Sequence, residues 1–206
     1  FLDGNGSWSA SSPLNMFIAP ILKKRFDLKN KSGVDCCISS WERINDNSLS
    51  PKIKVGANYI NSRAGQLEAI RNGYDFPIFL NNLGKVSEGP GACLFMVRDN
   101  MLITPPTTAS ILESITRKTI IELAQKELKI DVEVRNIDRT ELYIADELFF
   151  CGTAVEILPI VSVDGINAGS GNAGKLTQII SDEYFKIVRG FNRDYLQYLT
   201  AIDYEK

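Results

Sequence analysis

Residues 52–69 read KIKVGANYINSRAGQLEA, and the rest of the chain is organised around this stretch. Its apolar side chains, continued by one residue beyond it, recur at helical spacing: Ile60, Ala64, Leu67 and Ile70. This spacing predicts a helix that packs the apolar stripe against a core. Lys54 then lies just before the helix, where a ligand could reach its amine. The ordinary alternative is a solvated loop lysine, because lysine side chains are mostly exposed.

The composition is that of an ordinary globular protein. The chain has 206 residues, 44% of them hydrophobic, with a formal net charge of -2. This is enough to bury a substantial core, and the basic cluster at residues 23–25 is too short to indicate nucleic-acid binding. The absence of histidine excludes histidine-activated nucleophiles and ordinary zinc enzymes, so no metal site is predicted. Acid–base chemistry must use Lys, Glu, Asp, Tyr or Cys.

The cysteines and the hydropathy pattern indicate a reducing compartment. The four cysteines have neither metal-ligand spacing nor a disulfide framework, and we expect them to be reduced and mostly buried. No apolar run is long enough to cross a bilayer, and the first residues lack the regions of a signal peptide. We therefore expect a cytoplasmic protein.

Strand and helix patterns alternate irregularly along the chain. Strands are predicted at residues 34–41, 76–80, 85–88, 92–97, 101–103, 131–134, 147–151 and 155–163. Helices are predicted from residue 59 to a stop at Gly73, from residue 116, at 140–145, and at 176–187 before Gly190. The second helix is predicted to bury Ile121, Ala124 and Leu128. Two hairpins follow, one joining 76–80 to 85–88 and one turned by Asp99-Asn100.

Six short motifs follow one another along the chain. They are Lys54-Val55-Gly56-Ala57-Asn58-Tyr59, Ser87-Glu88-Gly89-Pro90-Gly91, Thr104-Pro105-Pro106, Ile115-Thr116-Arg117, Leu142-Tyr143-Ile144-Ala145-Asp146-Glu147 and Cys151-Gly152-Thr153-Ala154. In these motifs and in their order the chain resembles the branched-chain amino acid aminotransferases, which are pyridoxal-phosphate enzymes of fold type IV. The resemblance covers most of the chain from about Val34 to Gly190, and six motifs in order are far more specific than one.

The resemblance implies an α+β fold, the fold type IV large domain, with a mixed β-sheet or pseudo-barrel and surrounding helices. Residues 1–20 would be the end of an otherwise missing N-terminal small domain, with its last strand at 15–19. Residues 21–33 would be the connector between domains, and residues 34–206 the domain that binds pyridoxal phosphate. Because the chain begins without methionine, we expect further sequence upstream.

The resemblance also implies the main chemical roles. Lys54 matches the lysine that holds the cofactor aldehyde as an imine and then moves a proton as general base and acid. Glu88 matches the carboxylate that pairs with the pyridine nitrogen and keeps it protonated. Tyr59 matches the tyrosine near the ring oxygen. The alternatives are that Lys52 or Lys175 serves instead of Lys54, or that no lysine does, and that Glu88 merely faces water at the end of a hairpin.

Further matched residues concern the phosphate, the ring and the substrate. Ser114, Ile115, Thr116 and Thr153 match the phosphate-binding positions, and Leu112 matches a residue that packs on the ring. The backbone amides of residues 152–154, namely Gly152, Thr153 and Ala154, match those that hold the substrate carboxylate, and Tyr59 also lies beside the substrate. The family often has glycine at the position of Ser114. The family's phosphate-binding arginine and pocket aromatics, which come from the small domain and a neighbouring subunit, have no counterpart in this chain.

The implied activity is pyridoxal-phosphate-dependent transamination of leucine, isoleucine or valine with 2-oxoglutarate, in a homodimer. D-amino acid aminotransferases and aminodeoxychorismate lyase share the lysine and glutamate chemistry and remain alternatives. A third possibility is a truncated, non-catalytic relative that serves as a folding or dimer-forming module.

Overall fold

The computed structural model describes residues 16–19, 21–22, 28 and 32–201. The predicted small-domain remnant and connector therefore lie largely outside the described residues. Residues 16–19, where we predicted a strand, are assigned to no strand, and Met16, Phe17 and Ile18 are exposed. The division into domains stays a prediction.

The described part of the chain contains one mixed sheet. Its strands are β1 (Val34–Glu42), β2 (Phe76–Leu80), β3 (Cys93–Arg98), β4 (Met101–Thr104), β5 (Val132–Val134), β6 (Glu147–Gly152), β7 (Glu156–Val163) and β8 (Ile166–Asn167). The order across the sheet is β2-β1-β7-β6-β3-β4-β5, and β8 pairs with β7. β1 pairs in parallel with β2 and β7, and β4 with β5, whereas β7, β6, β3 and β4 pair antiparallel in succession. The predicted mixed sheet of an α+β fold is confirmed.

The two edges of the sheet are joined by irregular segments. Phe79 N donates to Glu88 O and Ser87 N donates to Phe79 O, both at 2.9 Å, so residues 85–88 run beside β2. On the far side, Val86 N donates at 2.9 Å to the carbonyl of Ile137, which follows β5. The sheet thus curls into the pseudo-barrel that the resemblance implied. The predicted first hairpin forms through these hydrogen bonds, with no regular strand at 85–88.

Two hydrophobic cores explain the continuous apolar runs of the central strands. Along β3, Leu94 and Met96 belong to a core that is shared by strands all around the curled sheet. Phe95 and Val97 belong to a second core beneath the helices. Because β3 and β6 are buried on both faces, their sequences are apolar at successive positions instead of alternating.

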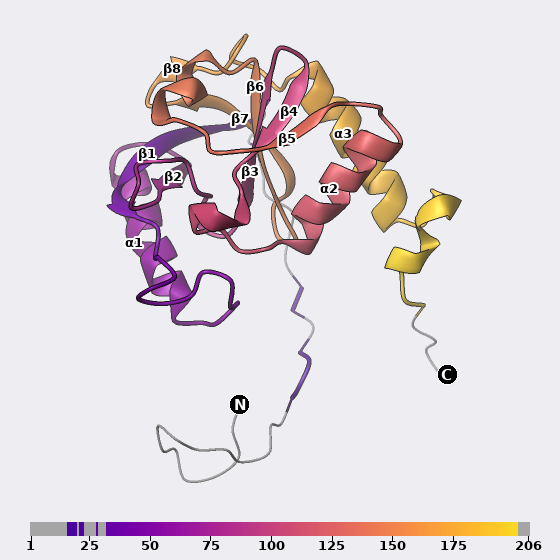
Figure 1. Ribbon diagram of the computed structural model, residues 1–206, viewed down its shortest axis with the longest axis horizontal. Helices are drawn as coiled ribbons and strands as arrows, with labels where there is room; N and C mark the ends of the chain where they lie inside the picture. The colour runs from indigo at the N-terminus through magenta and orange to yellow at the C-terminus, as the bar shows by residue number, and fades with distance from the viewer. Residues whose placement is uncertain (1–15, 20, 23–27, 29–31, 202–206) are drawn as a thin grey trace.

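Three α-helices cover the sheet. They are α1 (Asn58–Arg71), α2 (Ile115–Lys126) and α3 (Lys175–Val188), with short 3-10 helices η1 (Thr107–Ala109), η2 (Arg139–Ile144) and η3 (Arg193–Tyr198) in the described residues. α1 packs on β1 and β2, whereas α2 and α3 pack on each other and on β6 (Figure 1). Gly73 follows α1 with φ +83° and Gly190 follows α3 with φ +74°, so both predicted stops are confirmed. The predicted helix at 140–145 is the 3-10 helix η2.

The predicted apolar stripe of α1 is wrong, although the helix itself is confirmed. Ile60, Leu67 and Ile70 are exposed by 74%, 42% and 58%. The buried face instead carries small and polar residues: Asn58, Ser62, Gly65 and Ala69. The reason is close approach, because a Cβ on Gly65 would lie 2.4 Å from the Phe79 ring. The helix lies so near the sheet that larger apolar side chains have no space on this face.

The buried face of α2 also differs from the prediction. Ile120 and Leu123 are fully buried together with Ala124, while Ile121 is only partly buried and Leu128 lies beyond the helix end. The first turn sets this rotation. Arg117 donates from Nε to Thr104 Oγ1 at 3.1 Å and from Nη2 to Pro105 O at 2.8 Å, which fixes the helix against the segment after β4.

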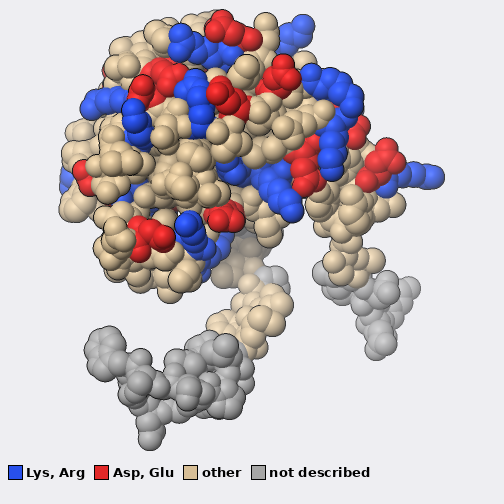
Figure 2. Space-filling view, in the orientation of Figure 1, with Lys and Arg blue, Asp and Glu red and all other residues tan. Residues whose placement is uncertain are grey.

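The surface carries both signs of charge. On the face drawn in Figure 2, acidic and basic side chains are interspersed, and no single-sign stripe of the kind that marks nucleic-acid binding runs across it. Among the described residues, no helix combines the length and apolarity that spanning a bilayer requires.

The packing of α1 on the sheet gives a test of stability. Alanine favours a helix over glycine by about 1 kcal/mol, but overpacking a full core costs about 1–3 kcal/mol. Because Phe79 is fully buried and the added Cβ would lie 2.4 Å from its ring, the overpacking cost should be at the upper end, about 3 kcal/mol. After the helix gain is subtracted, Gly65→Ala should lower the free energy of unfolding by about 2 kcal/mol in urea titration. Gly56→Ala is the matched control, because nothing lies within 4 Å of its Cβ position. An equal effect of the two changes would contradict the close approach.

Candidate active site

A cavity of about 310 Å³ opens where four segments meet. These are the loop before α1, the turn between residue 88 and β3, the segment that starts α2, and the turn between β6 and β7. Most of the predicted site residues line it: Lys54, Tyr59, Glu88, Leu112, Ser114, Ile115, Gly152 and Thr153. They come from distant parts of the sequence, from Lys54 to Thr153, and the pseudo-barrel brings their loops together.

Two predicted residues are placed differently. Ala154 does not line the first cavity but lines an adjacent one of about 300 Å³, which shares Lys54, Tyr59 and Thr153 with the first. Thr116 is buried, and its side chain lies near the Tyr184 hydroxyl of α3. The side chain of Thr116 therefore packs between α2 and α3, and Thr116 lines neither cavity.

The loop that carries Lys54 is tied to the start of α1. Asn58 Nδ2 donates to the carbonyls of Ser50 at 2.9 Å and Ile53 at 2.8 Å. Val55 N donates back to Ile53 O at 2.9 Å, so the backbone on both sides of Lys54 is held. The Lys54 side chain itself is exposed at the cavity wall. A fixed backbone with a reachable amine is the arrangement expected of a reactive lysine.

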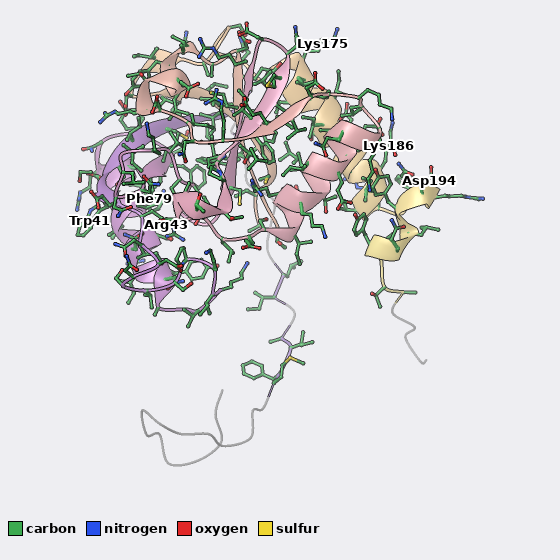
Figure 3. All side chains as sticks on the ribbon, viewed as in Figure 1. Trp41, Arg43, Phe79, Lys175, Lys186 and Asp194 are labelled. Atoms are coloured by element: carbon green, nitrogen blue, oxygen red, sulfur yellow. The ribbon has the colours of Figure 1, made fainter. Side chains whose placement is uncertain are left out.

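Glu88 is buried and paired with an arginine that the sequence analysis did not single out. Glu88 is 2% exposed and Arg43 is 7% exposed. Arg43 Nε donates to Glu88 Oε1 at 2.9 Å, and Nη2 lies 2.8 Å from the same oxygen. The alternative that Glu88 faces water at a hairpin end is therefore wrong. Figure 3 shows Arg43 beside Phe79, whose ring centroid lies 5.8 Å from the guanidinium carbon.

The second oxygen of Glu88 has weaker contacts. Oε2 accepts from Leu112 N at 3.3 Å, and the Cys93 thiol lies 4.0 Å away. Burial raises the pKa of Glu88 to about 7, although Arg43, the Leu112 amide and Lys54 each lower it. The carboxyl thus changes its charge near neutral pH, which is typical of groups that exchange protons with a ligand.

α2 begins at the cavity, and the start of a helix is a favourable place for an anion. Ser114 caps the helix, and its Oγ accepts from Arg117 N at 3.3 Å. The amides of Ile115 and Thr116 belong to the first turn, where intrahelical acceptors do not exist, and the positive end of the helix dipole favours an anion. Ser114 therefore serves the helix as a cap at a position where glycine would leave the first turn uncapped.

Two cysteines line the cavity, and one of them, Cys151, is poorly suited to nucleophilic chemistry. Cys93 and Cys151 face each other across β3 and β6, and both are free thiols. Burial raises the pKa of the Cys151 thiol well above its ordinary value, so the reactive thiolate is disfavoured. All four cysteines are free and buried, as the sequence analysis predicted.

Arg43 and Asn58 are the functional candidates that sequence reasoning missed. Asn58 lies inside the first motif, but its role depends on which carbonyls the loop presents to it. Arg43 follows an apolar strand, and a charged residue at a strand end is usually solvated. A buried carboxylate does require a cation, and that requirement was the available signal.

Comparisons with known proteins identify the family of the chain. The chain matches the family described as "Amino-transferase class IV" over residues 3–163. It is 43% identical over 173 residues to the branched-chain-amino-acid aminotransferase of Escherichia coli (strain K12), covering 84% of this chain and 56% of the relative. The Salmonella typhimurium enzyme of the same name is 43% identical over 171 residues, with 83% and 55% covered.

A solved structure shares the fold. The branched-chain amino acid aminotransferase of Thermobaculum terrenum, in its PLP-form, superposes with a TM-score of 0.81 at 48% identity. The match covers 84% of this chain and 56% of that one. The chain thus spans just over half the length of the relatives that it matches.

The burial of Glu88 makes a prediction about stability and pH. Its pKa is raised from 4.5 to about 7 on folding, so its contribution is fully present below about pH 4.5 and is lost as pH rises through 7. Glu88→Gln removes this titration. The difference in unfolding free energy, wild type minus variant, should fall by about 3 kcal/mol between these pH values in urea titrations.

Glu113→Gln is the matched control, because Glu113 is an exposed carboxylate at the rim of the same cavity. If the free energy of unfolding changed with pH in the same way for wild type and Glu88→Gln, the Glu88 carboxyl would not have a raised pKa.

Proposed function

The chain belongs to the class IV aminotransferase family, and from this premise we propose that it binds pyridoxal 5'-phosphate and transaminates branched-chain L-amino acids with 2-oxoglutarate. The observation that carries the proposal is the shared cavity of Lys54 and Glu88. One end of this cavity offers a reachable amine. The cavity also offers a carboxylate that is buried and paired with a cation, namely Glu88 with Arg43.

The donor set fits the cofactor. Pyridoxal phosphate has an aldehyde, a basic ring nitrogen, a phenolic oxygen and a phosphate, and the cavity wall offers one group for each. These are the Lys54 amine, the Glu88 carboxylate, the Tyr59 hydroxyl and the amide-rich start of α2. When bound, the cofactor acts as an electron sink for the electron pair of the substrate Cα–H bond.

Lys54 is proposed to act twice. Its Nζ is the nucleophile that would hold the aldehyde carbon, and, once released, the base that takes the proton from the substrate Cα. The hydrogen bonds of Asn58 to Ser50 O and Ile53 O support this role, since they fix the backbone from which the amine reaches into the cavity.

Glu88 and Tyr59 are proposed to tune charge. Glu88 Oε2 would accept the N–H of the ring nitrogen, and an anionic carboxylate there keeps that nitrogen protonated. The Tyr59 hydroxyl would donate to the phenolic oxygen. Tyr59 lines both cavities, which supports a second role for it beside the substrate. Leu112 is proposed to pack on the ring, and its amide already holds Glu88.

The phosphate and the substrate carboxylate are proposed to use backbone amides. Ile115 and Thr116 would present first-turn N–H groups to the phosphate, with the hydroxyls of Ser114 and Thr153 as further donors. Gly152 to Ala154 form the turn between β6 and β7, whose amides would hold the substrate carboxylate. Gly152 lies close to the neighbouring turn, since a Cβ there would be 3.4 Å from Gly91 O.

The proposed preference for branched-chain substrates is supported by the relatives. The two that are 43% identical to this chain are named branched-chain-amino-acid aminotransferases. D-amino acid aminotransferase, aminodeoxychorismate lyase and a non-catalytic relative are the competing functions. A homodimer and a cytoplasmic location complete the proposal as predictions.

The lysine assignment is tested by trapping. After pyridoxal phosphate is added to the protein at its full natural length, borohydride reduction and peptide mass spectrometry should place the adduct on Lys54. Lys54→Ala should lose the adduct and lower transamination of L-leucine by about 100-fold or more, since a positioned base contributes that much. Lys175→Ala is the control, because Lys175 begins α3, far from Arg43 in Figure 3.

Half-reactions separate the competing functions. Conversion of bound cofactor by L-leucine supports the proposal. Turnover of only D-alanine or aminodeoxychorismate would reject the branched-chain assignment, and absence of any cofactor binding would favour the non-catalytic relative.

A further inference from the structure

We propose that Arg43 is a positioning residue, which favours the anionic form of Glu88 and reserves one of its carboxylate oxygens for the ring nitrogen of the cofactor. This inference rests on the proposed function and deepens it. Arg43 also lines the cavity, but the contacts of its guanidinium are to Glu88, Asn61 and Ser62. It acts through Glu88.

The two oxygens of Glu88 are in different situations. Oε1 faces two N–H donors of Arg43, Nε at 2.9 Å and Nη2 at 2.8 Å, which is the geometry of a strong charge-assisted pair. Among the residues that the structure describes, Oε2 has only the long contacts to Leu112 N at 3.3 Å and Cys93 Sγ at 4.0 Å. Oε2 therefore keeps accepting capacity, and its two neighbours both line the cavity.

Arg43 is itself held from several sides. Its Nη1 donates to Asn61 Oδ1 and Ser62 Oγ, both at 3.2 Å, and its backbone N donates to Leu80 O at 2.8 Å. The guanidinium also lies over the Phe79 ring. With contacts to β2, to α1 and to Glu88, Arg43 has no room to turn away, so the orientation of the Glu88 carboxylate is fixed as well.

Arg43 is the permanent charge among the groups that face Glu88. The others are the Lys54 amine from the loop before α1, the Cys93 thiol on β3 and the Cys151 thiol on β6. Lys54 must be neutral to act as a nucleophile or base, and the thiols carry no positive charge. An arginine does not lose its proton in proteins, so its charge stays through the whole cycle.

This charge decides what Glu88 can do. Burial alone disfavours the anion, and the pKa of Glu88 at about 7 is already the balance of burial against Arg43. Without Arg43 the carboxyl would be neutral at physiological pH. A neutral carboxyl would no longer hold a proton on the ring nitrogen.

The first test uses the cofactor-free protein. Infrared difference spectroscopy follows the carboxyl band of Glu88, which is assigned by its loss in Glu88→Gln. In Arg43→Met, which keeps the stem but removes the charge, the titration midpoint should rise by about 1–3 pH units. Arg43→Lys should restore part of the shift, because it keeps the charge but loses the two-donor geometry. Arg63→Met is the control, since Arg63 is an exposed arginine beside Ser62.

A separate comparison of variants tests whether the change at Arg43 impairs folding. Removing one partner of a buried ion pair is destabilising, so Arg43→Met is compared with Arg43→Met/Glu88→Gln, in which no unpaired charge remains. If Arg43→Met does not fold, Arg43→Lys carries the titration alone. A midpoint unchanged from wild type in the folded Arg43 variants would overturn the proposal.

The second test uses the loaded enzyme. Arg43→Met should lower kcat for L-leucine, with KM nearly unchanged, and should move the pH profile and the absorbance of the bound cofactor. Unchanged values, in a wild type that binds pyridoxal phosphate and turns over, would overturn the role of Arg43. A wild type that binds no cofactor would instead reject the proposed function, while the cofactor-free titration would still decide whether Arg43 controls Glu88.

Discussion

The ion pair of Arg43 and Glu88 is the constraint on which the site depends. Burying two charges costs several kcal/mol each, and well-packed apolar residues in their place are often as stable or more stable. Stability alone therefore gives no reason for this pair. Its effect is to set a carboxylate, dry and oriented, at the wall of a cavity. The surrounding fold supplies partners for all three guanidinium nitrogens of Arg43.

The pair explains the unusual face of α1. A helix usually buries its apolar stripe, yet Ile60, Leu67 and Ile70 are exposed. The inward face must accept from Arg43, which Ser62 does, and must come close to Phe79, which Gly65 allows. The polar requirement of the site thus outweighs the hydrophobic pattern of the helix. The same helix begins beside Lys54, so the orientation of Arg43 and the position of the amine are linked through one rigid element.

Curling of the sheet puts the remaining groups in reach. Residues 85–88 are held between β2 and the segment after β5, and this places Glu88 at the end of the pseudo-barrel where β3 begins. β6 pairs with β3, so the turn that carries Gly152 and Thr153 opens at the same end. α2 starts there as well, because Arg117 ties its first turn to the segment after β4. The amine of Lys54 must be exposed to be reached by a ligand, whereas the carboxylate of Glu88 is buried. This end of the pseudo-barrel offers both environments.

The sequence by itself determined most strands, the helix positions, the buried free cysteines and the short motifs, because these follow from local periodicity and local backbone chemistry. It also pointed to Lys54 and Glu88 as residues of one site, through the order of those motifs. Only the tertiary structure decided that Arg43 pairs with Glu88, that Asn58 clamps the lysine loop and that α1 turns its apolar stripe outward. The physical reason is that these depend on which backbone segments approach each other. The periodicity of a sequence shows how apolar one face of a helix or strand is. It does not show how close the neighbouring element lies, or which charged side chains that element carries.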